Sequence, residues 1–241
     1  MNLLILGRGK TGSVVAEVAR QRRHHVRVLS AAENSNASAL TPDALAPLDA
    51  AIDFTTPAAA VANAEACIRA RKNLVVGTTG WSDQLPRLRE MVLSAKTGFL
   101  YGSNFSIGVN LFFEIVATAG AALKYDYQGQ IFERHHAQKK DAPSGTAITL
   151  QKIVRESGGQ EKEVEIVSFR EGDVVGMHEI TFDSLNDRIY LCHDAKSRRG
   201  FAEGAVRAAE WLAGKTGFYE FRNVTLAKYS DKGKPPRAYA L

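Results

Sequence analysis

The sequence predicts an α/β fold in which a parallel sheet covered by helices is followed by a second, α+β unit with a mixed or antiparallel sheet. Three observations support this prediction. Short apolar runs alternate with amphipathic segments over the first part of the chain, which is typical of repeated βαβ units. The first apolar run leads into a glycine-rich turn, and three strand-like runs follow one another late in the chain.

Apolar runs at 2–6, 25–30, 50–54 and 73–80 are expected to form buried strands, with a further short run at 98–104. Helices are expected from the glycine-rich turn to about residue 23, from Pro57 onward, and over 82–96. Strands that alternate with helices in this way form parallel sheets, and their crossover connections are right-handed.

The character of the chain changes after Asn104. Residues 105–123 are expected to form a helix that is apolar nearly all round, which indicates burial at a domain or subunit interface. A strand over 127–136 and a helix over 144–157 precede the strand-like runs 163–170, 176–182 and 187–195. Residues 201–214 form an expected final amphipathic helix, and 228–241 is expected to be a mobile tail.

Composition is that of an ordinary globular protein, with 45% hydrophobic and 24% charged residues among 241. No apolar run is expected to reach the roughly 18 residues that a membrane span requires, and the N-terminus does not have the pattern of a signal peptide. Cys67 and Cys192 lie far apart without metal-ligand spacing, so reduced thiols are expected. These features favour the cytoplasm and predict no metal site.

The net charge of +5 and the isoelectric point of about 9.2 raise the question of nucleic-acid binding. The basic residues are scattered and are not interleaved with aromatic residues on one face, which argues against it. A modest positive field also suits a small polyanionic ligand. We therefore expect a small-molecule partner and neither nucleic acid nor membrane.

The turn after the first strand has the spacing G-x-G-x-x-G, formed by Gly7, Arg8, Gly9, Lys10, Thr11 and Gly12. Glycines allow a tight turn and let backbone N–H groups approach a pyrophosphate at a helix N-terminus. A purely structural turn is the alternative, but it would not need two basic residues among its glycines. The turn therefore predicts a nucleotide cofactor.

Coenzyme choice depends on the end of the second strand, where NAD-specific sites place an acid on the ribose hydroxyls. That position falls near Ser30, with two alanines after it and Glu33 only later. No acid there repels a 2′-phosphate, and no arginine clearly binds one. The sequence slightly favours NADPH and leaves NADH open.

Small and polar residues follow three later strands, in the segments DFTTP, GTTG and GSNFS. Each could be an ordinary turn before a helix. Ligands of open α/β sheets, however, bind at the carboxyl ends of strands. Three such ends in succession favour a groove for the nicotinamide half of the coenzyme.

The segment ERHHAQKKDAPSGTA, residues 133–147, combines several groups suited to an anionic substrate. His135 and His136 can carry protons near neutral pH, and Lys139 and Lys140 follow on the expected loop. Ser144 is a plausible helix cap, with backbone donors at Gly145 and Thr146. A solvated basic loop is the alternative, but the position just before a helix N-terminus favours a site for a small dicarboxylate that needs protonation.

This segment resembles the substrate signature of the 4-hydroxy-tetrahydrodipicolinate reductase (dihydrodipicolinate reductase) family, E-x-H-H-x-x-K-x-D-A-P-S-G-T-A. The similarity extends over nearly the whole chain, through DFTTP, VVGTTGW, NFSIGVN, REGDVVGMHEITF and HDAKSRRGFAEGAVRAAEWL. The resemblance implies a Rossmann-like dinucleotide-binding domain at 1–105 and 200–241. It implies a substrate-binding and tetramerisation domain at 106–199, hence a homotetramer.

The resemblance also assigns roles by position. His135 would be the acid–base residue and Lys139 a second proton donor or carboxylate anchor. His136, Ser144, Gly145 and Thr146 would hold the substrate carboxylates. The cofactor groove would be lined by the glycine turn, Ser30 and the residues Phe54, Gly77, Thr78, Thr79, Gly102, Ser103, Asn104 and Phe105.

The implied reaction is reduction of 4-hydroxy-tetrahydrodipicolinate in lysine and diaminopimelate biosynthesis, with His135 protonating the enamine that hydride addition leaves. Thr11 stands where the family commonly has Met, and LSAAENS replaces the usual adenine-ribose segment, so coenzyme preference transfers least. Two alternatives remain at this point. One is a reductase of another small amino dicarboxylate, similar to aspartate dehydrogenase, and the other is a nucleotide-sensing regulator.

Overall fold

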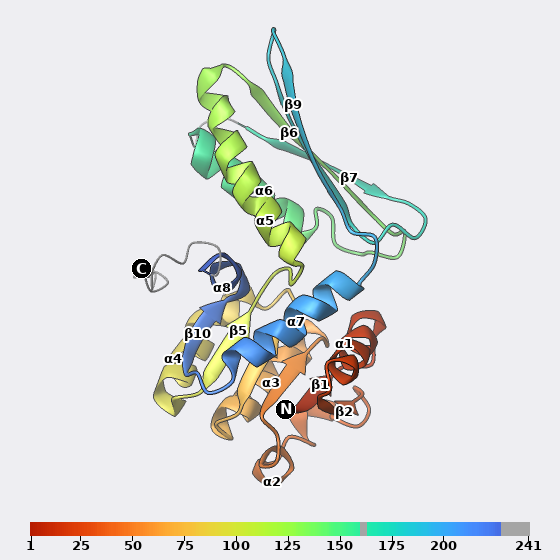
Figure 1. Ribbon diagram of the computed structural model, residues 1–241, viewed down its shortest axis with the longest axis vertical. Coiled ribbons are helices and arrows are strands. Elements are labelled where there is room, and N and C mark those ends of the chain that lie inside the picture. Colours follow the sequence, from red (N-terminus) through yellow and green to blue (C-terminus); the bar gives the residue numbers. More distant parts are fainter. Residues whose placement is uncertain (160–162, 228–241) are drawn as a thin grey trace. The chain divides into compact units, whose positions relative to one another are not determined.

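The computed structural model describes residues 1–159 and 163–227, so the expected tail at 228–241 lies outside the described residues. The chain forms two compact units, which can be followed by colour in Figure 1. Unit 1 contains Met1–Ile107 and the described residues from Arg199 onward, and unit 2 contains Gly108–Arg198. The chain therefore leaves unit 1, builds unit 2 and then returns.

Unit 1 is built on a 6-stranded sheet in the order β10-β5-β4-β3-β1-β2, and every pairing in it is parallel. The strands are β1 (Asn2–Leu6), β2 (His25–Leu29), β3 (Ala50–Asp53), β4 (Asn73–Val76), β5 (Gly98–Tyr101) and β10 (Gly217–Glu220). The strand order reverses between β1 and β3, and ligands of such sheets bind at this reversal. The predicted parallel, Rossmann-like sheet is confirmed.

Helices cover both faces of this sheet (Figure 1). They are α1 (Lys10–Gln21), α2 (Pro42–Leu45), α3 (Pro57–Arg69), α4 (Leu85–Ala95), α7 (Arg199–Leu212) and α8 (Phe221–Ala227). Side chains alternate between the faces of a strand. Leu3 and Ile5 therefore pack against α1 and α7, whereas Leu4 and Leu6 pack on the other face with α3 and α4.

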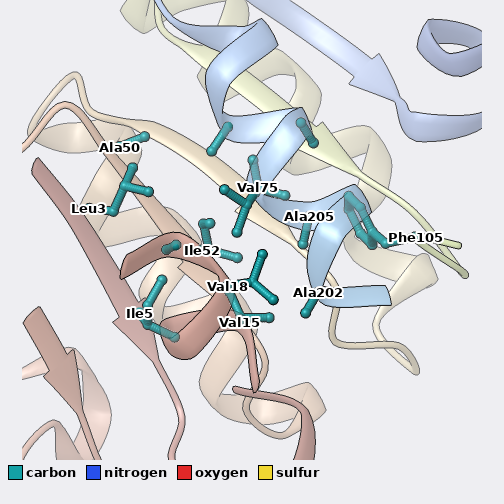
Figure 2. Close-up of a cluster of buried hydrophobic side chains, with 14 of the residues drawn as sticks. Leu3, Ile5, Val15, Val18, Ala50, Ile52, Val75, Phe105, Ala202 and Ala205 are labelled. Atoms are coloured by element: carbon teal, nitrogen blue, oxygen red, sulfur yellow. The ribbon is translucent and has the colours of Figure 1, made fainter. Parts of the chain in front are cut away.

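Figure 2 shows the first of these cores, where Ile5 and Ile52 of the sheet lie beside Val15 and Val18 of α1, with Ala205 of α7 close by. Small alanines along α7 permit close approach, since Ala202, Ala205 and Ala209 are fully buried. A helix that is distant in sequence thus completes the core of unit 1.

Unit 2 has a 4-stranded mixed sheet in the order β7-β6-β8-β9. Its strands are β6 (Gln128–His135), β7 (Glu165–Arg170), β8 (Met177–Asp183) and β9 (Arg188–Asp194). β6 and β7 are parallel, because α6 (Gly145–Gly158) connects them as a crossover, while the other two pairings are antiparallel. α6 and α5 (Ile107–Ala119) supply Leu150, Phe112 and Phe113 to a core shared with Ile131 and Phe182.

The expectation that no apolar run reaches the length of a membrane span is wrong for the first helix of unit 2. α5 and the 3-10 turn after it, η3 (Gly120–Tyr125), give a stretch that is long and apolar enough to cross a membrane by length and composition. Core helices pass the same test. In this stretch Val109, Phe112 and Val116 are buried against the sheet of unit 2.

Four short elements were not expected from the sequence. They are the 3-10 turn η1 (Ser35–Ala37), the helix α2, and β10 and α8 after the helix that was expected to be last. The 3-10 turn η2 (Ser82–Gln84) falls within the helix expected over 82–96. β10 adds a parallel edge strand beside β5. Phe218 of β10 stacks on Phe99, with ring centroids 5.0 Å apart.

Candidate active site

The glycine turn of unit 1 is packed too closely for larger residues. Gly7 has a φ of +102°, and a Cβ atom there would lie 2.2 Å from the carbonyl oxygen of Phe54. A Cβ atom on Gly12 would lie 2.2 Å from the carbonyl oxygen of Gly7. Gly9, directly before α1, has open space around it. Backbone N–H groups at this helix start can therefore be approached by a pyrophosphate, and the turn fits a dinucleotide.

An acid lies at the end of β2 after all. The carboxylate of Glu33 accepts hydrogen bonds from the backbone N of Ser30 at 2.8 Å and from its Oγ at 2.6 Å. The Arg8 guanidinium lies 3.6 Å from the same oxygen. The hydrogen bonds from Ser30 lower the pKa of Glu33, so it is ionised at neutral pH. The loop folds back and places Glu33 where sequence spacing placed only Ser30.

A buried carboxylate organises the ends of β3 and β4. Asp53 is fully buried, and its Oδ1 accepts hydrogen bonds from the N and Oγ1 of Thr55 and from Oγ1 of Thr78. Its Oδ2 accepts from Asn63, which is hydrogen-bonded in turn to Asn34. Burial raises the pKa of Asp53 even though these hydrogen bonds oppose the shift. Asp53 thus ties the loops after β2, β3 and β4 together.

The predicted groove residues gather around the ring of Phe54. A Cβ atom on Gly77 would lie 2.2 Å from this ring, so only glycine leaves the ring its place. Phe105 meets Phe54 edge-on, with centroids 6.2 Å apart, and Gly102 lies against Phe105. Among the other predicted cofactor residues, Lys10, Thr79 and Ser103 are exposed and Thr11 and Asn104 are partly buried.

In unit 2, the end of β6 carries a buried acid and a buried imidazole on the same face. Glu133 is 0% exposed and His135 is 8% exposed. Residues two apart on a strand point to the same side, and Nδ1 of His135 makes an ion-pair contact with Oε2 of Glu133. The second oxygen of Glu133 accepts hydrogen bonds from Nη2 of Arg170 at 2.7 Å and from the backbone N of Ser144 at 3.3 Å.

These contacts shift the protonation of both groups. Burial by itself raises the pKa of Glu133, but hydrogen bonds from Arg170 and Ser168 and the charge of His135 outweigh it and lower the pKa to about 2. Burial lowers the pKa of His135 from its ordinary value, although Glu133 opposes this. Glu133 is therefore a fixed negative charge, and His135 can gain or lose a proton.

His178 on β8 lies on the other side of His135, with ring centroids 5.2 Å apart. Its Nε2 lies 3.1 Å from Oγ of Ser144, which also accepts a hydrogen bond from the backbone N of Ala147 and so caps α6. Burial and the neighbouring His135 lower the pKa of His178 to about 3. His178 is thus neutral, and the predicted cap at Ser144 is confirmed.

The remaining predicted substrate residues lie on the loop between β6 and α6 or at the start of the helix. Nζ of Lys139 pairs with both carboxylate oxygens of Asp141, at 2.7 and 2.8 Å. Nδ1 of His136 is buried and has no hydrogen-bond partner within residues 1–159 and 163–227. Gly145 is exposed with open space around it, and Thr146 is buried. The structure thus brings His135 and Ser144 together, while Lys139 faces Asp141.

Glu133, His135 and His178 offer donor atoms within 4.8 Å of one another, a separation that a metal site would allow. Two observations argue against a metal ion. The guanidinium of Arg170 already contacts Glu133, and the imidazole of His135 is in direct contact with the carboxylate. The three residues are better described as a buried network of one carboxylate and two imidazoles.

No role was assigned from the sequence to Asp53, Arg170 or His178, and Glu33 was set aside as lying beyond the expected position. Glu133 was quoted as part of the signature without a role. A signal was available for two of them, because a carboxylate or imidazole inside an otherwise apolar strand needs a partner when buried. Asp53 ends an apolar run, and His178 lies within one.

Comparison with protein families gives matches over both units. Residues 1–105 match the family model described as dihydrodipicolinate reductase, N-terminus. Residues 108–225 match the model described as dihydrodipicolinate reductase, C-terminus. The two matches together span nearly all of the residues that the structure describes.

Individual relatives agree with these matches. The chain is 38% identical to the 4-hydroxy-tetrahydrodipicolinate reductase of Christiangramia forsetii, over 93% of this chain and 97% of that protein. It is 42% identical to the reductase of the same name from Archaeoglobus fulgidus, over 71% and 73% of the two chains. The solved structure of dipicolinate-bound dihydrodipicolinate reductase from Paenisporosarcina sp. TG-14 shares the fold, with a TM-score of 0.71 and 24% identity over 93% of this chain and 99% of that chain.

Proposed function

Because this chain belongs to the dihydrodipicolinate reductase family, we propose that it reduces 4-hydroxy-tetrahydrodipicolinate to tetrahydrodipicolinate with a reduced pyridine nucleotide. The substrate is a small cyclic dicarboxylate, and the reaction belongs to diaminopimelate and lysine biosynthesis. The relatives compared above are oxidoreductases by name.

The observation that carries the proposal is the link between His135 and the N-terminus of α6. Glu133 contacts both the imidazole and the backbone N of Ser144. His178 contacts both the imidazole ring and Oγ of Ser144. A proton donor is thereby held beside a helix start that attracts carboxylates, as a dicarboxylate that must be protonated requires.

His135 is the proposed proton donor. When bound, a reduced pyridine nucleotide would supply the hydride that reduces the unsaturated ring formed after loss of water. The enamine that results needs one proton on carbon, which the imidazolium of His135 delivers. General acid catalysis of this kind contributes about 10²–10⁴-fold to a rate.

Lys139 is the proposed anchor of one substrate carboxylate. Its ammonium group is already paired with Asp141 and largely shielded, with 22% of the side chain exposed. A substrate carboxylate can take over from Asp141, because the partners are chemically alike. The second carboxylate would be bound by backbone N–H groups at Gly145 and Thr146 and by His136, so that the ring is held in one orientation.

The position of Glu33 changes the expected preference between NADH and NADPH. The ionised carboxylate of Glu33 lies at the end of β2, where it is hydrogen-bonded to Ser30. It also forms an ion pair with Arg8 of the glycine turn. Acids at this place accept hydrogen bonds from ribose hydroxyls, whereas a 2′-phosphate would meet like charge. We therefore propose that NADH is preferred, against the slight preference for NADPH drawn from the sequence.

The decisive experiment follows the oxidation of NADH and NADPH with freshly generated 4-hydroxy-tetrahydrodipicolinate, for the wild type and for His135→Gln and Lys139→Ala. Turnover with the wild type is expected. His135→Gln should lower kcat by about 10²-fold or more while the coenzyme Kd is unchanged. Lys139→Ala should raise KM about 10- to 100-fold, since a hydrogen bond to a charged group contributes about 1.5–3 kcal/mol.

The same assay separates the alternatives. A reductase of another amino dicarboxylate would turn over that compound and not the cyclic one. A nucleotide-sensing regulator would bind coenzyme without any turnover. Near-wild-type turnover in both variants would remove the proposed roles of His135 and Lys139.

We also propose that the protein is a cytoplasmic homotetramer that assembles through unit 2. The face of its sheet opposite α5 and α6 carries Phe169 and Tyr190, whose exposed fractions are 39% and 55%. Phe132 and Met177 occupy the same face by strand alternation. Arg134 lies on this face as well, with its guanidinium over the ring of Phe169, so the face offers both apolar and charged groups for pairing with another subunit.

A further inference from the structure

We propose that Glu133 and Arg170 act together as positioning residues that fix which ring nitrogen of His135 carries the exchangeable proton. The inference rests on the proposed function, in which His135 is the proton donor. It goes further because it assigns a role to two residues that contact neither substrate nor coenzyme in that proposal. The two act through His135.

The first step is the position of Glu133. It is fully buried on β6, two residues before His135, and one of its oxygens contacts Nδ1 of the imidazole. The other oxygen is occupied by Arg170 and by the backbone N of Ser144. A carboxylate held at both oxygens keeps its orientation, so we infer that its ion-pair contact keeps a proton on Nδ1 and leaves Nε2 as the nitrogen that exchanges protons.

The second step is the space around Nε2. A Cβ atom on Gly176 would lie 3.0 Å from Nε2 of His135, so glycine leaves room beside this nitrogen. Nδ1, in contrast, faces the buried carboxylate. The approach of the substrate carbon is therefore assigned to the side of Nε2.

The third step is the set of charges that face His135 from each packed element. Glu133 contributes from its own strand, Arg170 from β7 and His178 from β8. Lys139 and Asp141 contribute from the loop before α6, and His193 on β9 faces His178. Burial lowers the pKa of His135 most, the charge of Glu133 raises it, and Lys139 and Arg170 lower it further.

Because Glu133 and Arg170 carry opposite charges, removing each charge should shift the dependence of kcat on pH in opposite directions. A general acid works only while protonated, so kcat falls as pH rises through its pKa. Glu133→Gln removes the charge that favours imidazolium, and the fall should move to lower pH by about 1 unit or more. Arg170→Met removes a charge that opposes imidazolium, and the fall should move to higher pH. A loss of packing alone would lower kcat without moving the profile in opposite directions.

The experiment titrates the histidine ring directly. The full-length protein is labelled with 13C at histidine Cε1, and the resonance of His135 is identified by its disappearance in His135→Gln. The pH midpoint of the His135 titration is measured by NMR in the wild type, Glu133→Gln and Arg170→Met. The dependence of kcat on pH is measured for the same proteins. Glu171→Gln is the matched control. Glu171 is the exposed residue directly after Arg170, and it pairs with Arg134.

Opposite displacements of the His135 midpoint in the two variants, with none in Glu171→Gln, would support the inference. An unchanged midpoint, or displacement in the same direction in both, would overturn it. If Glu133→Gln does not fold, Arg170→Met alone decides: a rise in the His135 midpoint supports the inference, and an unchanged or lowered midpoint overturns it. Full turnover in His135→Gln would instead count against the proposed function, since the titration does not depend on catalysis.

Discussion

The proposed preference for NADH depends on the side chain of Glu33. Its carboxylate is held by two hydrogen bonds from Ser30 at the end of β2. Glu33→Gln should remove the repulsion of a 2′-phosphate and raise kcat/KM for NADPH relative to NADH about 10-fold, which corresponds to about 1.4 kcal/mol. Steady-state kinetics with both coenzymes measure this ratio.

Glu17→Gln is a suitable control, because Glu17 lies on α1 and pairs with Arg199 away from Ser30. It should leave the coenzyme ratio unchanged. A Glu33→Gln ratio equal to that of the wild type would show that Glu33 does not contact the adenine ribose.

Gly176 is a second residue whose size matters. Its backbone does not require glycine by conformation, but a methyl group would lie 3.0 Å from Nε2 of His135. Gly176→Ala should therefore lower kcat by about 10-fold or more, because a small misplacement at the reacting centre is costly. The melting temperature and the coenzyme Kd should change little. A variant with wild-type kcat would mean that the proton does not leave through Nε2.

At the scale of single residues, the sequence indicated candidate site residues more readily than the residues that contact them in the fold. His135, Lys139 and Gly7 could be identified because their spacing in the chain is local. Asp53 and His178 carried a signal as polar groups in apolar runs, but their partners could not be predicted, because the fold brings them together, as it brings Glu133 opposite His178. Glu33 was set aside because a three-residue loop folds back in a way that strand spacing does not show.

At the scale of secondary structure, β6, β8 and α6 share a pH-sensitive junction. His178 has a pKa lowered to about 3, mainly by burial. The unfolded chain would protonate it near its ordinary value, so the folded state binds fewer protons between that value and about 3. The stability contributed by neutral His178 is present above pH 6.5 and is lost as pH falls toward 3.

We therefore expect the free energy of unfolding to decrease by a few kcal/mol as pH falls from 7 to 4. His178→Gln keeps a polar group near Ser144 but does not titrate, so its stability should depend less on pH. Urea unfolding at several pH values measures both. Identical pH dependence in the two proteins would exclude His178 as the cause.

The elements themselves were predicted well where periodicity was strong. The parallel strands β1 to β3 and helices α1, α6 and α7 match the expected ranges closely, whereas β4 ends at Val76, four residues before the end of the expected run 73–80. β10 and α8 were missed because four to seven residues carry too little pattern to indicate an element. β7 pairs parallel to β6 because the expected helix between them is a crossover, which a simple run of strands does not reveal.

At the scale of the whole molecule, the outer face of the sheet in unit 2 predicts assembly. Tyr190→Glu would place a charge on the edge strand β9 within the proposed contact and should convert tetramers into smaller species. Size-exclusion chromatography with light scattering measures the mass. Tyr125→Glu is the control, because Tyr125 is 74% exposed in η3 and lies off this face. A wild-type protein that is already monomeric would contradict the proposal.

The general architecture was accessible from the sequence, because alternation of strands and helices followed by successive strands separates two kinds of sheet. The functional roles of the two units stay predictions. What the sequence could not give is the set of contacts that bring α7 back to α1, since these depend on residues nearly two hundred positions apart, such as Arg22 and Glu210.

The return of α7 has a consequence for how the protein is made. Unit 2 is contiguous in the chain, so it can close its own core soon after it leaves the ribosome. Unit 1 exposes the apolar side of β1, β3 and α1 until α7 has been synthesised, because Ala202, Ala205 and Ala209 complete that core. The earlier-translated unit is therefore the later one to mature, and nascent chains halted before Arg199 should be the ones that chaperones retain.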